Sequence, residues 1–354
     1  TADEPVGSVQ SENASQRSGQ VSVTDQSMEV RSAGGIEEVV VTAQKREQSL
    51  QDTPIALTAI TASTIDDLDI KNVVDMAGIS PNVMLVETPS NNTSATIAMR
   101  GGVTINPAIT WEPTVGVYLD GVYLGKTQGA IFDVVDLERV EILRGPQGTL
   151  YGRNTLGGAI NLISQRPNGS GVETKLTLGN YGLTQAQFTT DFEIADGTYG
   201  KLVVNSKERD GYVHNAPGPY GGAQGVVPSA DPTVNELDTI NSHGFRFTIA
   251  RDTDNSSFDL SVDYNDQSNT PPFAQLGYTI PNWSAAFGVG ASPATGGLKL
   301  WPIELYTSKG RAKVAHVNEA VFEKSEVSGV ALTYSRDTNL GTVKAILARR
   351  DTEW

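Results

Sequence analysis

The sequence contains no cysteine, and that absence removes several classes of function at once. Disulfides, zinc–thiolate sites and thiol catalysis all depend on cysteine side chains. Histidine is scarce as well: the three present, His214, His243 and His316, lie far apart and show no ligand spacing. We therefore expect neither a bound metal nor a cofactor, and we interpret each histidine as a surface or strand residue.

Long hydrophobic runs are missing too, because no stretch of about 18 apolar residues occurs, the length that a membrane-spanning helix needs. No basic and apolar signal peptide opens the chain, so we expect its numbering to begin after processing or inside a longer protein. Positive charge is scarce: 26 Lys and Arg stand against 41 Asp and Glu, which leaves a formal charge of −15. Nucleic acid is therefore not expected as a partner, since phosphate binding needs clustered cations.

Signs of catalysis are absent as well. The chain shows no Ser/His/Asp or paired-carboxylate arrangement with a specific spacing, so an enzyme is not expected. The segment Gly152–Gly158 has glycines like those of a phosphate-binding loop but lacks the Gly-Lys-Ser/Thr that contacts nucleotide. We interpret these glycines as turn formers.

The N-terminal stretch, residues 1–35, is rich in Ser, Gln, Glu and Gly and poor in large apolar groups. It cannot bury enough surface to offset its ordering entropy, so we predict a flexible tether. A short β-branched run follows at residues 36–43. This run suits either a strand that adds itself to the sheet edge of another protein or the ordinary first strand of the next domain.

Residues 44–167 show the pattern of a compact α+β domain. Strands are predicted in PIALTAITA, VMLVE, ATIAMRG, VGVYLDGVYLG and RVEILRG, with short helices in ASTIDDLDI and NVVDMAGI. Ser63 or Thr64 is the expected N-cap of the first helix. Asp120-Gly121, between two apolar runs, predicts a type I′ hairpin.

From residue 168 to residue 354 the chain alternates apolar and polar residues at period two, for example in FDLSVDYN. A soluble antiparallel sheet with one wet face would show the same alternation. Short turns on one side and long loops on the other favour the transmembrane strands of an outer-membrane β-barrel. About seven strands are expected, at residues 172–179, 183–192, 199–209, 243–252, 257–266, 328–336 and 341–350.

Several motifs between residues 36 and 167 resemble those of the TonB-dependent outer-membrane receptors and transporters. EVVVTA, at residues 38–43, resembles a TonB box, Met99–Gly102 resembles the plug motif "IRG", and Val115–Gly125 resembles the central plug strands. VEILRGPQGTLYGRNTLGGAIN, at residues 140–161, is similar to the end of the plug. The resemblance implies an α+β plug domain followed by antiparallel strands of a barrel of about 22 strands.

About seven strands are too few to close such a barrel, so we expect either that the chain is part of a longer protein or that a second chain completes it. The resemblance implies uptake of a scarce ligand, most often an iron–siderophore complex, across the bacterial outer membrane. The implied partners are TonB with its inner-membrane energising complex, outer-membrane lipid, and a small-molecule or metal-chelate ligand. Two alternatives are a ligand-binding or signalling receptor of the same architecture, and uptake of a non-iron cargo such as a sugar or cobalamin. A signalling receptor is expected to carry a further folded domain before the TonB box, for which residues 1–35 are too short and too polar.

The resemblance also selects candidate residues. TonB is expected to bind Glu38, Val39, Val40, Val41, Thr42 and Ala43. Residues expected to shape the plug or lock it in place are Arg100, Gly101, Glu141, Arg144, Gly145, Pro146, Gly148, Tyr151, Gly152, Arg153, Gly157 and Gly158. The arginines among them, once enclosed, need carboxylate or carbonyl partners. The resemblance implies barrel glutamates, whereas Glu138 and Glu141 are the alternative within the plug.

Ligand contacts are expected from plug apices and from the long connection at residues 268–326. The aromatic candidates are Trp111, Phe273, Tyr278 and Trp283. Aromatic side chains in such a loop bind flat ligands or pack among themselves, and both interpretations are open.

Overall fold

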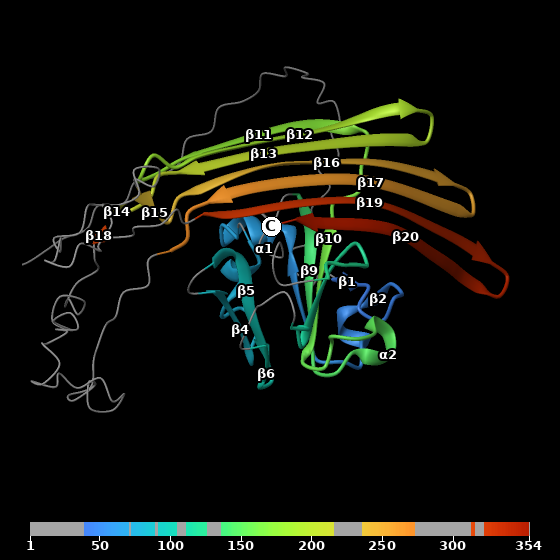
Figure 1. Ribbon diagram of the computed structural model, residues 1–354. Helices are drawn as coiled ribbons and strands as arrows, with labels where there is room; N and C mark the ends of the chain where they lie inside the picture. Colours follow the sequence, from blue (N-terminus) through green and yellow to red (C-terminus); the bar gives the residue numbers. More distant parts are fainter. Residues whose placement is uncertain are drawn as a thin grey trace, which may run out of the picture. The chain divides into compact units, whose positions relative to one another are not determined.

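The structure is a computed structural model that describes residues 39–70, 72–88, 91–104, 111–125, 136–215, 236–272, 313–315 and 322–353. Val39–Trp354 form one compact unit, which contains several small sheets and one long antiparallel sheet (Figure 1). Of the predicted site residues, Glu38, Phe273, Tyr278 and Trp283 lie outside the described residues. Within the described ranges, no helix is long and apolar enough to cross a membrane.

A five-stranded mixed sheet forms the centre of the first half, in the order β3-β9-β10-β7-β8. Strand β10 runs parallel to β7, and the other neighbouring pairs are antiparallel. The bounds are β3 Leu57–Thr61, β7 Val115–Leu119, β8 Val122–Tyr123, β9 Leu137–Arg144 and β10 Gly158–Ser164.

Smaller elements surround this sheet. Two further sheets contain β1 Val40–Val41 with β2 Gln48–Ser49, and β4 Val83–Thr88 with β5 Asn91–Met99 and β6 Gly102–Val103. The helical segments are η1 Leu50–Asp52, α1 Ala62–Asp67, η2 Val73–Met76 and α2 Gly148–Tyr151.

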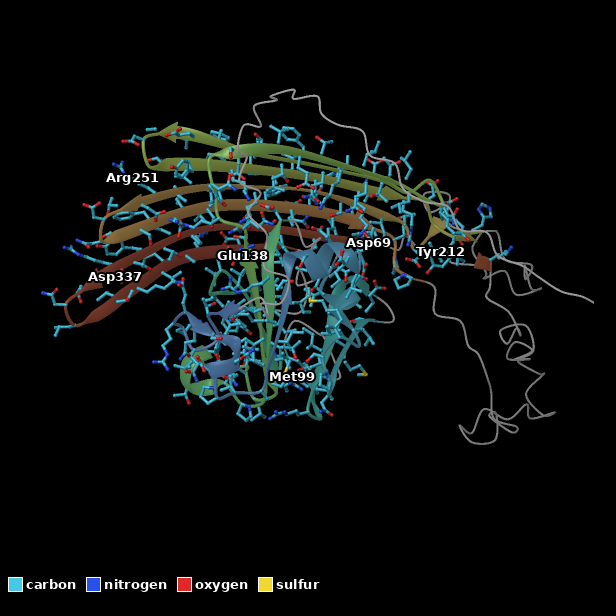
Figure 2. The ribbon with its side chains drawn as sticks, turned by 180° about the vertical axis from the view of Figure 1, so that it is seen from behind. Asp69, Met99, Glu138, Tyr212, Arg251 and Asp337 are labelled. Atoms are coloured by element: carbon cyan, nitrogen blue, oxygen red, sulfur yellow. The ribbon has the colours of Figure 1, made fainter. Side chains whose placement is uncertain are left out.

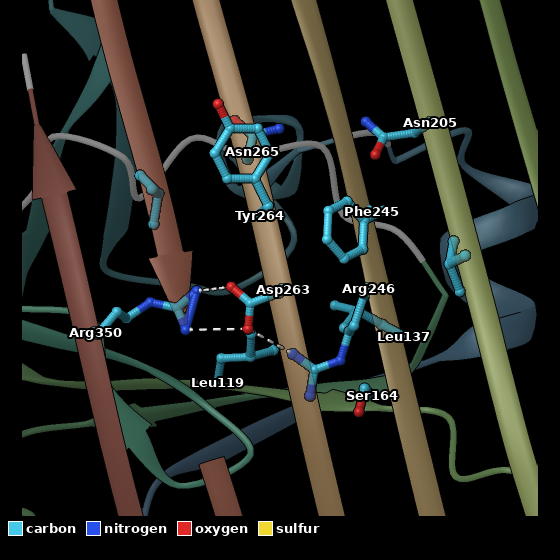
Figure 3. A pocket seen from close by; sticks show the side chains of 12 residues that line it. Leu119, Leu137, Ser164, Asn205, Phe245, Arg246, Asp263, Tyr264, Asn265 and Arg350 are labelled. Carbon is cyan, nitrogen blue, oxygen red and sulfur yellow. Dashed lines mark hydrogen bonds and ion pairs between the residues drawn. The ribbon is translucent and has the colours of Figure 1, made fainter. Parts of the chain in front are cut away.

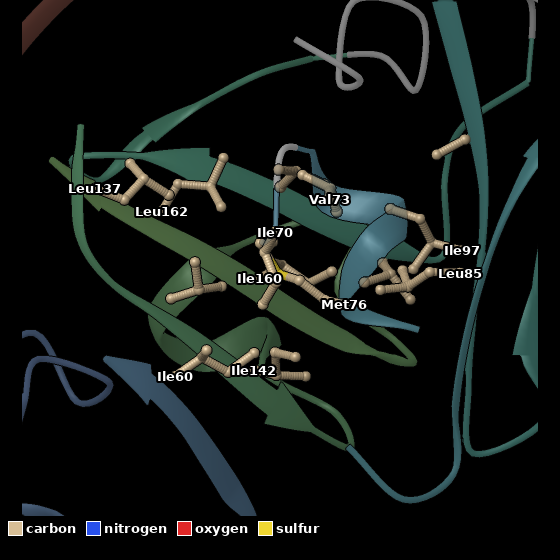
Figure 4. Close-up of a cluster of buried hydrophobic side chains, with 14 of the residues drawn as sticks. Ile60, Ile70, Val73, Met76, Leu85, Ile97, Leu137, Ile142, Ile160 and Leu162 are labelled. Atoms are coloured by element: carbon tan, nitrogen blue, oxygen red, sulfur yellow. The ribbon is translucent and has the colours of Figure 1, made fainter. Parts of the chain in front are cut away.

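Strand β9 is covered on both faces, which explains its nearly continuous burial. Val140 and Ile142 point into the main apolar cluster, together with Ile60, Ile160, Leu162 and Met76 (Figure 4). Alternation along the strand turns Glu141 and Leu143 to the opposite face. Leu143 packs there against a second cluster formed by Ala43, Tyr118, Tyr151 and Ala159.

Two local predictions from the sequence have different outcomes. The Asp120-Gly121 hairpin is confirmed, with positive φ angles of 50° and 85° at its two turn residues, as a type I′ turn requires. The predicted N-cap of α1 is wrong, because Thr61, and neither Ser63 nor Thr64, caps the helix. Thr61 ends the extended strand β3, so its hydroxyl is placed to accept the backbone N–H of Thr64 at 3.4 Å.

The second half is a seven-stranded antiparallel sheet in the order β11-β12-β13-β16-β17-β19-β20. Its strands are β11 Ser170–Leu178, β12 Thr184–Ala195, β13 Thr198–Arg209, β16 Ile240–Thr253, β17 Ser256–Asn269, β19 Glu323–Thr338 and β20 Gly341–Glu353. Each of the seven predicted strands is confirmed, although most extend by a few residues. A small sheet at the far end contains β14 Val213–Asn215, β15 Glu236–Leu237 and β18 Val314–Ala315.

The two faces of the seven-stranded sheet differ in polarity. One face carries exposed apolar side chains, among them Phe245, Phe258, Leu260, Val262, Val330 and Leu332. The other, which we call the wall, carries polar and charged residues such as Lys201, Asn205, Arg246 and Asp263 and lies toward the plug strands. Arg251 and Asp337 lie near the end of the sheet where the tight turns are (Figure 2).

Two glycines of the plug differ sharply in what a side chain would meet. A Cβ at Gly158 would lie 2.2 Å from Leu143 O and 2.2 Å from Met99 Sδ, and the residue has a φ of 154°. A Cβ at Gly148 would meet nothing within 4 Å.

We therefore expect Gly158→Ala to destabilise the plug by at least about 2 kcal/mol, since backbone atoms must move. Gly148→Ala should be neutral or stabilise it by about 0.4–1 kcal/mol. The measurement is the temperature at which the plug of the complete protein becomes sensitive to protease in detergent. Equal midpoints for the two variants would contradict the packing described for Gly158.

Candidate functional site

The β-branched segment at residues 39–43 lies against the plug. Val40 and Val41 pair with Ser49 and Gln48 in a short antiparallel hairpin, and the backbone N–H of Leu50 donates to Val39 O at 2.9 Å. Val41 is buried at 1% exposure, whereas Val40 is 44% exposed. The segment is therefore held as a strand with one apolar side chain inward and one outward.

Its last two residues are anchored through polar contacts to the plug sheet. The backbone N–H of Thr42 donates to Glu141 Oε1 at 2.7 Å, and the Thr42 hydroxyl donates to the same oxygen at 3.1 Å. Tyr151 donates its hydroxyl to Ala43 O at 2.9 Å. Glu141 and Ala43 both have an exposure of 0%, so these contacts are made away from solvent.

Glu141 is stabilised by further donors, as a buried carboxylate must be. Arg139 Nε donates to Oε1 at 2.9 Å, and Asn161 Nδ2 donates to Oε2 at 3.3 Å. Asn161 also donates to the Tyr151 hydroxyl at 2.6 Å. We call Glu141, Arg139, Asn161 and Tyr151 the carboxylate anchor.

The elements of the plug explain why the carboxylate anchor assembles here. Glu141 and Asn161 are directly opposite each other on β9 and β10, and α2 ends at Tyr151. Burial raises the pKa of Tyr151 to about 12, with the nearby charge of Glu141 acting in the same direction. The Tyr151 hydroxyl therefore keeps its proton and remains a donor at physiological pH. The ammonium group of Lys45 lies 4.0 Å from the centre of the Tyr151 ring, a cation–π contact just beyond the anchored residues.

A second group of polar contacts joins the plug to the wall. Asp120 pairs with Arg246 and Asp136 with Lys201, while the more exposed Asp66 pairs with Lys175. In these three pairs the plug supplies the acid and the wall the cation. Arg166, in the connection after β10, forms the reverse arrangement with Asp252 and Asp259 at distances of 2.6 Å and 2.7 Å.

The predicted plug residues lie in different surroundings. Arg144 donates to Pro81 O at 3.3 Å, and the Arg100 guanidinium lies against Gly145, where an added Cβ would be 2.7 Å from Nη1. Glu138 and Glu141 both pair with Arg139, a residue that the sequence analysis did not single out. That Arg100, Arg144 and Arg153 lock the plug to barrel glutamates stays a prediction.

The remaining predicted residues include glycines of the plug and Trp111. Gly145 and Gly152 have positive φ angles of 107° and 82°, and Gly101 one of 82°. Gly157 lies close to Val115. Trp111 is 55% exposed and stays a candidate for ligand contact. In the part of the chain that the structure describes, no group of three or more His, Asp or Glu side chains is placed to hold a metal ion.

Sequence reasoning missed most of the charged residues that the structure brings together. Arg139, Asp136, Lys201 and Arg246 were not selected, because none belongs to a quoted motif, and Asp120 was interpreted only as a turn residue. One signal was present in the sequence. Lys201 and Arg246 lie in strands that alternate apolar and polar residues, at positions whose side chains point to the polar face of the sheet. A long cation at such a position indicates a partner opposite that face.

Comparison with known proteins identifies the fold. Residues 49–159 match the family model described as the TonB-dependent Receptor Plug Domain. This segment of the chain is a plug domain of the TonB-dependent receptor type.

Among the relatives of this chain is the vitamin B12 transporter BtuB of Vibrio vulnificus. It is 30% identical over 179 residues, which are 49% of this chain and 28% of that protein. The catecholate siderophore receptor Fiu of Escherichia coli K12 is 30% identical over 172 residues, 47% of this chain and 21% of that protein. The chain thus spans only about a quarter of the length of these curated relatives.

Solved structures of TonB-dependent receptors share the fold. The ferric yersiniabactin uptake receptor FyuA of Yersinia pestis superimposes with a TM-score of 0.61 at 19% identity, over 84% of this chain and 41% of that one. The ferripyoverdine receptor of Pseudomonas aeruginosa, solved with ferripyoverdine bound, gives a TM-score of 0.63 at 14% identity, over 88% and 36%. The predicted combination of a plug domain and an incomplete set of antiparallel barrel strands is confirmed.

Whether Glu141 holds the segment at residues 39–43 can be tested with a spin label. Because the sequence contains no cysteine, a single introduced cysteine is the only labelled position. A nitroxide attached at Val40→Cys labels one position, which is already partly exposed. Adding Glu141→Gln removes the anionic acceptor and costs about 1.5–3 kcal/mol, so we expect the label to become more mobile in the spin-resonance spectrum. Glu138→Gln is the matched control, because it changes the same arginine's outer partner, which is 51% exposed. Identical spectra for the two variants would show that Glu141 does not hold the segment.

Proposed function

We propose that this chain is the plug and the first barrel strands of an active transporter that takes up a scarce ligand across the outer membrane. The proposed cargo is an iron–siderophore complex, and the proposed energy source is TonB with its inner-membrane complex. Three of the proteins reported above are named as receptors of a catecholate siderophore, of ferric yersiniabactin or of ferripyoverdine, which supports this class of cargo. Relatives of this kind are transporters and receptors, and we infer transport rather than catalysis for this chain.

The observation that carries the proposal is the way in which residues 39–43 are held. Val40 and Val41 pair with the two residues of β2, and among the described contacts it is Thr42 and Ala43 that tie the segment to the plug sheet. A short β-branched strand with a small pairing partner is suited to exchange that partner for the sheet edge of another protein. Under this proposal residues 36–43 are the TonB box, residues 1–35 its periplasmic tether, residues 44–167 the plug and residues 168–354 the first part of the barrel.

A second cargo deserves the same experiment, because a vitamin B12 transporter is among the relatives. The complete protein is expressed in a strain that lacks its own iron and cobalamin receptors. Uptake of ⁵⁵Fe bound to catecholate, hydroxamate or phenolate–thiazoline chelators is then measured beside uptake of labelled cobalamin. Iron uptake that stops when a protonophore is added supports the proposal. Uptake of cobalamin alone supports the alternative, and uptake of neither contradicts both.

The TonB-box assignment has its own test in Val40→Pro. Proline removes a backbone donor and blocks strand addition, so we expect uptake to be lost while binding of the same ligand to whole cells is retained. Val40→Ala keeps the backbone N–H and serves as the matched control, with uptake close to that of the unchanged protein. Normal uptake by Val40→Pro would show that this segment is not the strand that TonB takes.

A further inference from the structure

A row of charged side chains crosses the wall at one level. Backbone register places Arg246 opposite Asp263, Asp263 opposite Gly329, and Gly329 opposite Arg350. Arg246 Nη1 lies 3.3 Å from Asp263 Oδ1, and Arg350 pairs with the same carboxylate from two strands away (Figure 3). Gly329 makes this reach possible, since a Cβ there would lie 2.6 Å from Arg350 Nη1. One carboxylate of the wall is therefore shared by two guanidinium groups.

The row has two guanidinium groups and one carboxylate, and the plug supplies a second carboxylate, that of Asp120. Asp120, at the tip of the β7–β8 hairpin, pairs with the Nη2 of Arg246. Its side chain also accepts the backbone N–H and the hydroxyl of Ser164, both at 2.9 Å. Asp120 has a φ of 50°, a left-handed conformation in which Asp and Asn are enriched among non-glycine residues. The hairpin thus presents a fixed anion to the wall.

The same arrangement recurs at Lys201. Its ammonium group lies 3.1 Å from Asp191 of the neighbouring strand and 3.0 Å from Asp136 of the plug. Lys201 is only 4% exposed, and burial raises the pKa of Asp136. Asp136 also has a positive φ, of 60°. A second plug aspartate in a left-handed conformation therefore meets a second cation of the wall.

The charges on the two sides are not balanced within each side. Among the described residues of the wall, the cations Arg246, Arg350 and Lys201 form ion pairs with two carboxylates, those of Asp263 and Asp191. The two plug aspartates complete the pairing. Any rearrangement of the plug that withdraws them leaves under-compensated cations on the wall, and such charges attract an anion.

Space and unused donors lie beside this row. A cavity of about 60 Å³ is bounded by Leu119, Leu137 and Ser164 of the plug and by Asn205 and the row itself on the wall (Figure 3). Within the described residues, Arg246 Nε, Arg350 Nε and Asn205 Nδ2 are buried and have no hydrogen-bond partner. These donors remain available to an acceptor that approaches when the plug moves.

We propose that Asp120 and Asp136 are placeholders for an anionic cargo. In the resting state they pair with two cationic sites of the wall, which we call the stations: Arg246 with Arg350, and Lys201. During passage, the negatively charged groups of a ferric chelate replace the two aspartates at these stations. The inference rests on the proposed transport function and adds the charge of the substrate to it. Carboxylate and phenolate groups suit the stations because guanidinium and ammonium groups donate to them in charge-assisted hydrogen bonds. A cationic chelate would be repelled at both stations.

The first test asks whether the stations bind an anion once the plug aspartates are neutral. In the complete protein, Asp120→Asn with Asp136→Asn removes both charges, and asparagine tolerates the left-handed backbone. We expect citrate to raise the midpoint of thermal unfolding of this double variant by a few degrees, relative to sodium chloride of equal ionic strength, since a ligand stabilises the state that binds it. The unchanged protein and Asp66→Asn, which alters an exposed pair, should show no such rise. A double variant that citrate does not stabilise would overturn the placeholder role.

The second test measures the passage of ions and needs no knowledge of the cargo. The complete protein is placed in a planar bilayer, its plug is loosened with urea, and the reversal potential is recorded in a potassium chloride gradient. We expect Arg246→Gln with Lys201→Gln to shift the reversal potential toward potassium relative to the unchanged protein. Arg251→Gln, on the same strand but the opposite face, is the matched control and should leave the potential unchanged. The absence of a shift in the double variant would overturn the inference, whereas absent uptake in cells would count against the transport proposal alone.

Discussion

Charge that leaves water must be paired where it lies, and this constraint organises the contacts of the molecule. A buried carboxylate or ammonium group without a partner costs several kcal/mol, so each enclosed charge here determines what lies beside it. Glu141 at full burial is surrounded by donors from Thr42, Arg139 and Asn161. The wall cations are met by aspartates from the plug. Apolar packing supplies most of the driving force for folding, but the charges specify which surfaces face each other.

The two polar regions are connected through the plug sheet. Glu141 on β9 is directly opposite Asn161 on β10, and Asn161 is opposite Tyr118 on β7. Strand β7 ends one residue before Asp120, the residue that contacts the wall. A pull on the segment at residues 39–43 therefore reaches the wall contact after crossing two strand pairs. This short route connects the anchored segment at residues 39–43 with the plug residue that contacts the wall.

The sequence predicted the features whose signals are local. Period-two alternation located all seven strands of the long sheet, and Asp120-Gly121 specified its turn because the required backbone conformation excludes most other residues. Features that depend on distant partners escaped. The bond between Thr42 and Glu141 joins residues 99 positions apart, and Arg350 reaches Asp263 only because the residue between them is a glycine. The N-cap of α1 is Thr61 and not the predicted Ser63 or Thr64, because the last residue of β3 is also the residue that caps the helix.

The parallel pairing of β10 with β7 has a consequence for the order of assembly. Parallel strands cannot be joined by a tight turn, and contacts between residues far apart in sequence form late, after the loop entropy has been overcome. Glu141 and Asn161 come together only when β9 and β10 have paired, and Thr42 has no complete acceptor site before that. The full set of contacts that anchors Thr42 and Ala43 therefore exists only in the assembled plug sheet, whereas the pairing of Val40 and Val41 with β2 is local in sequence.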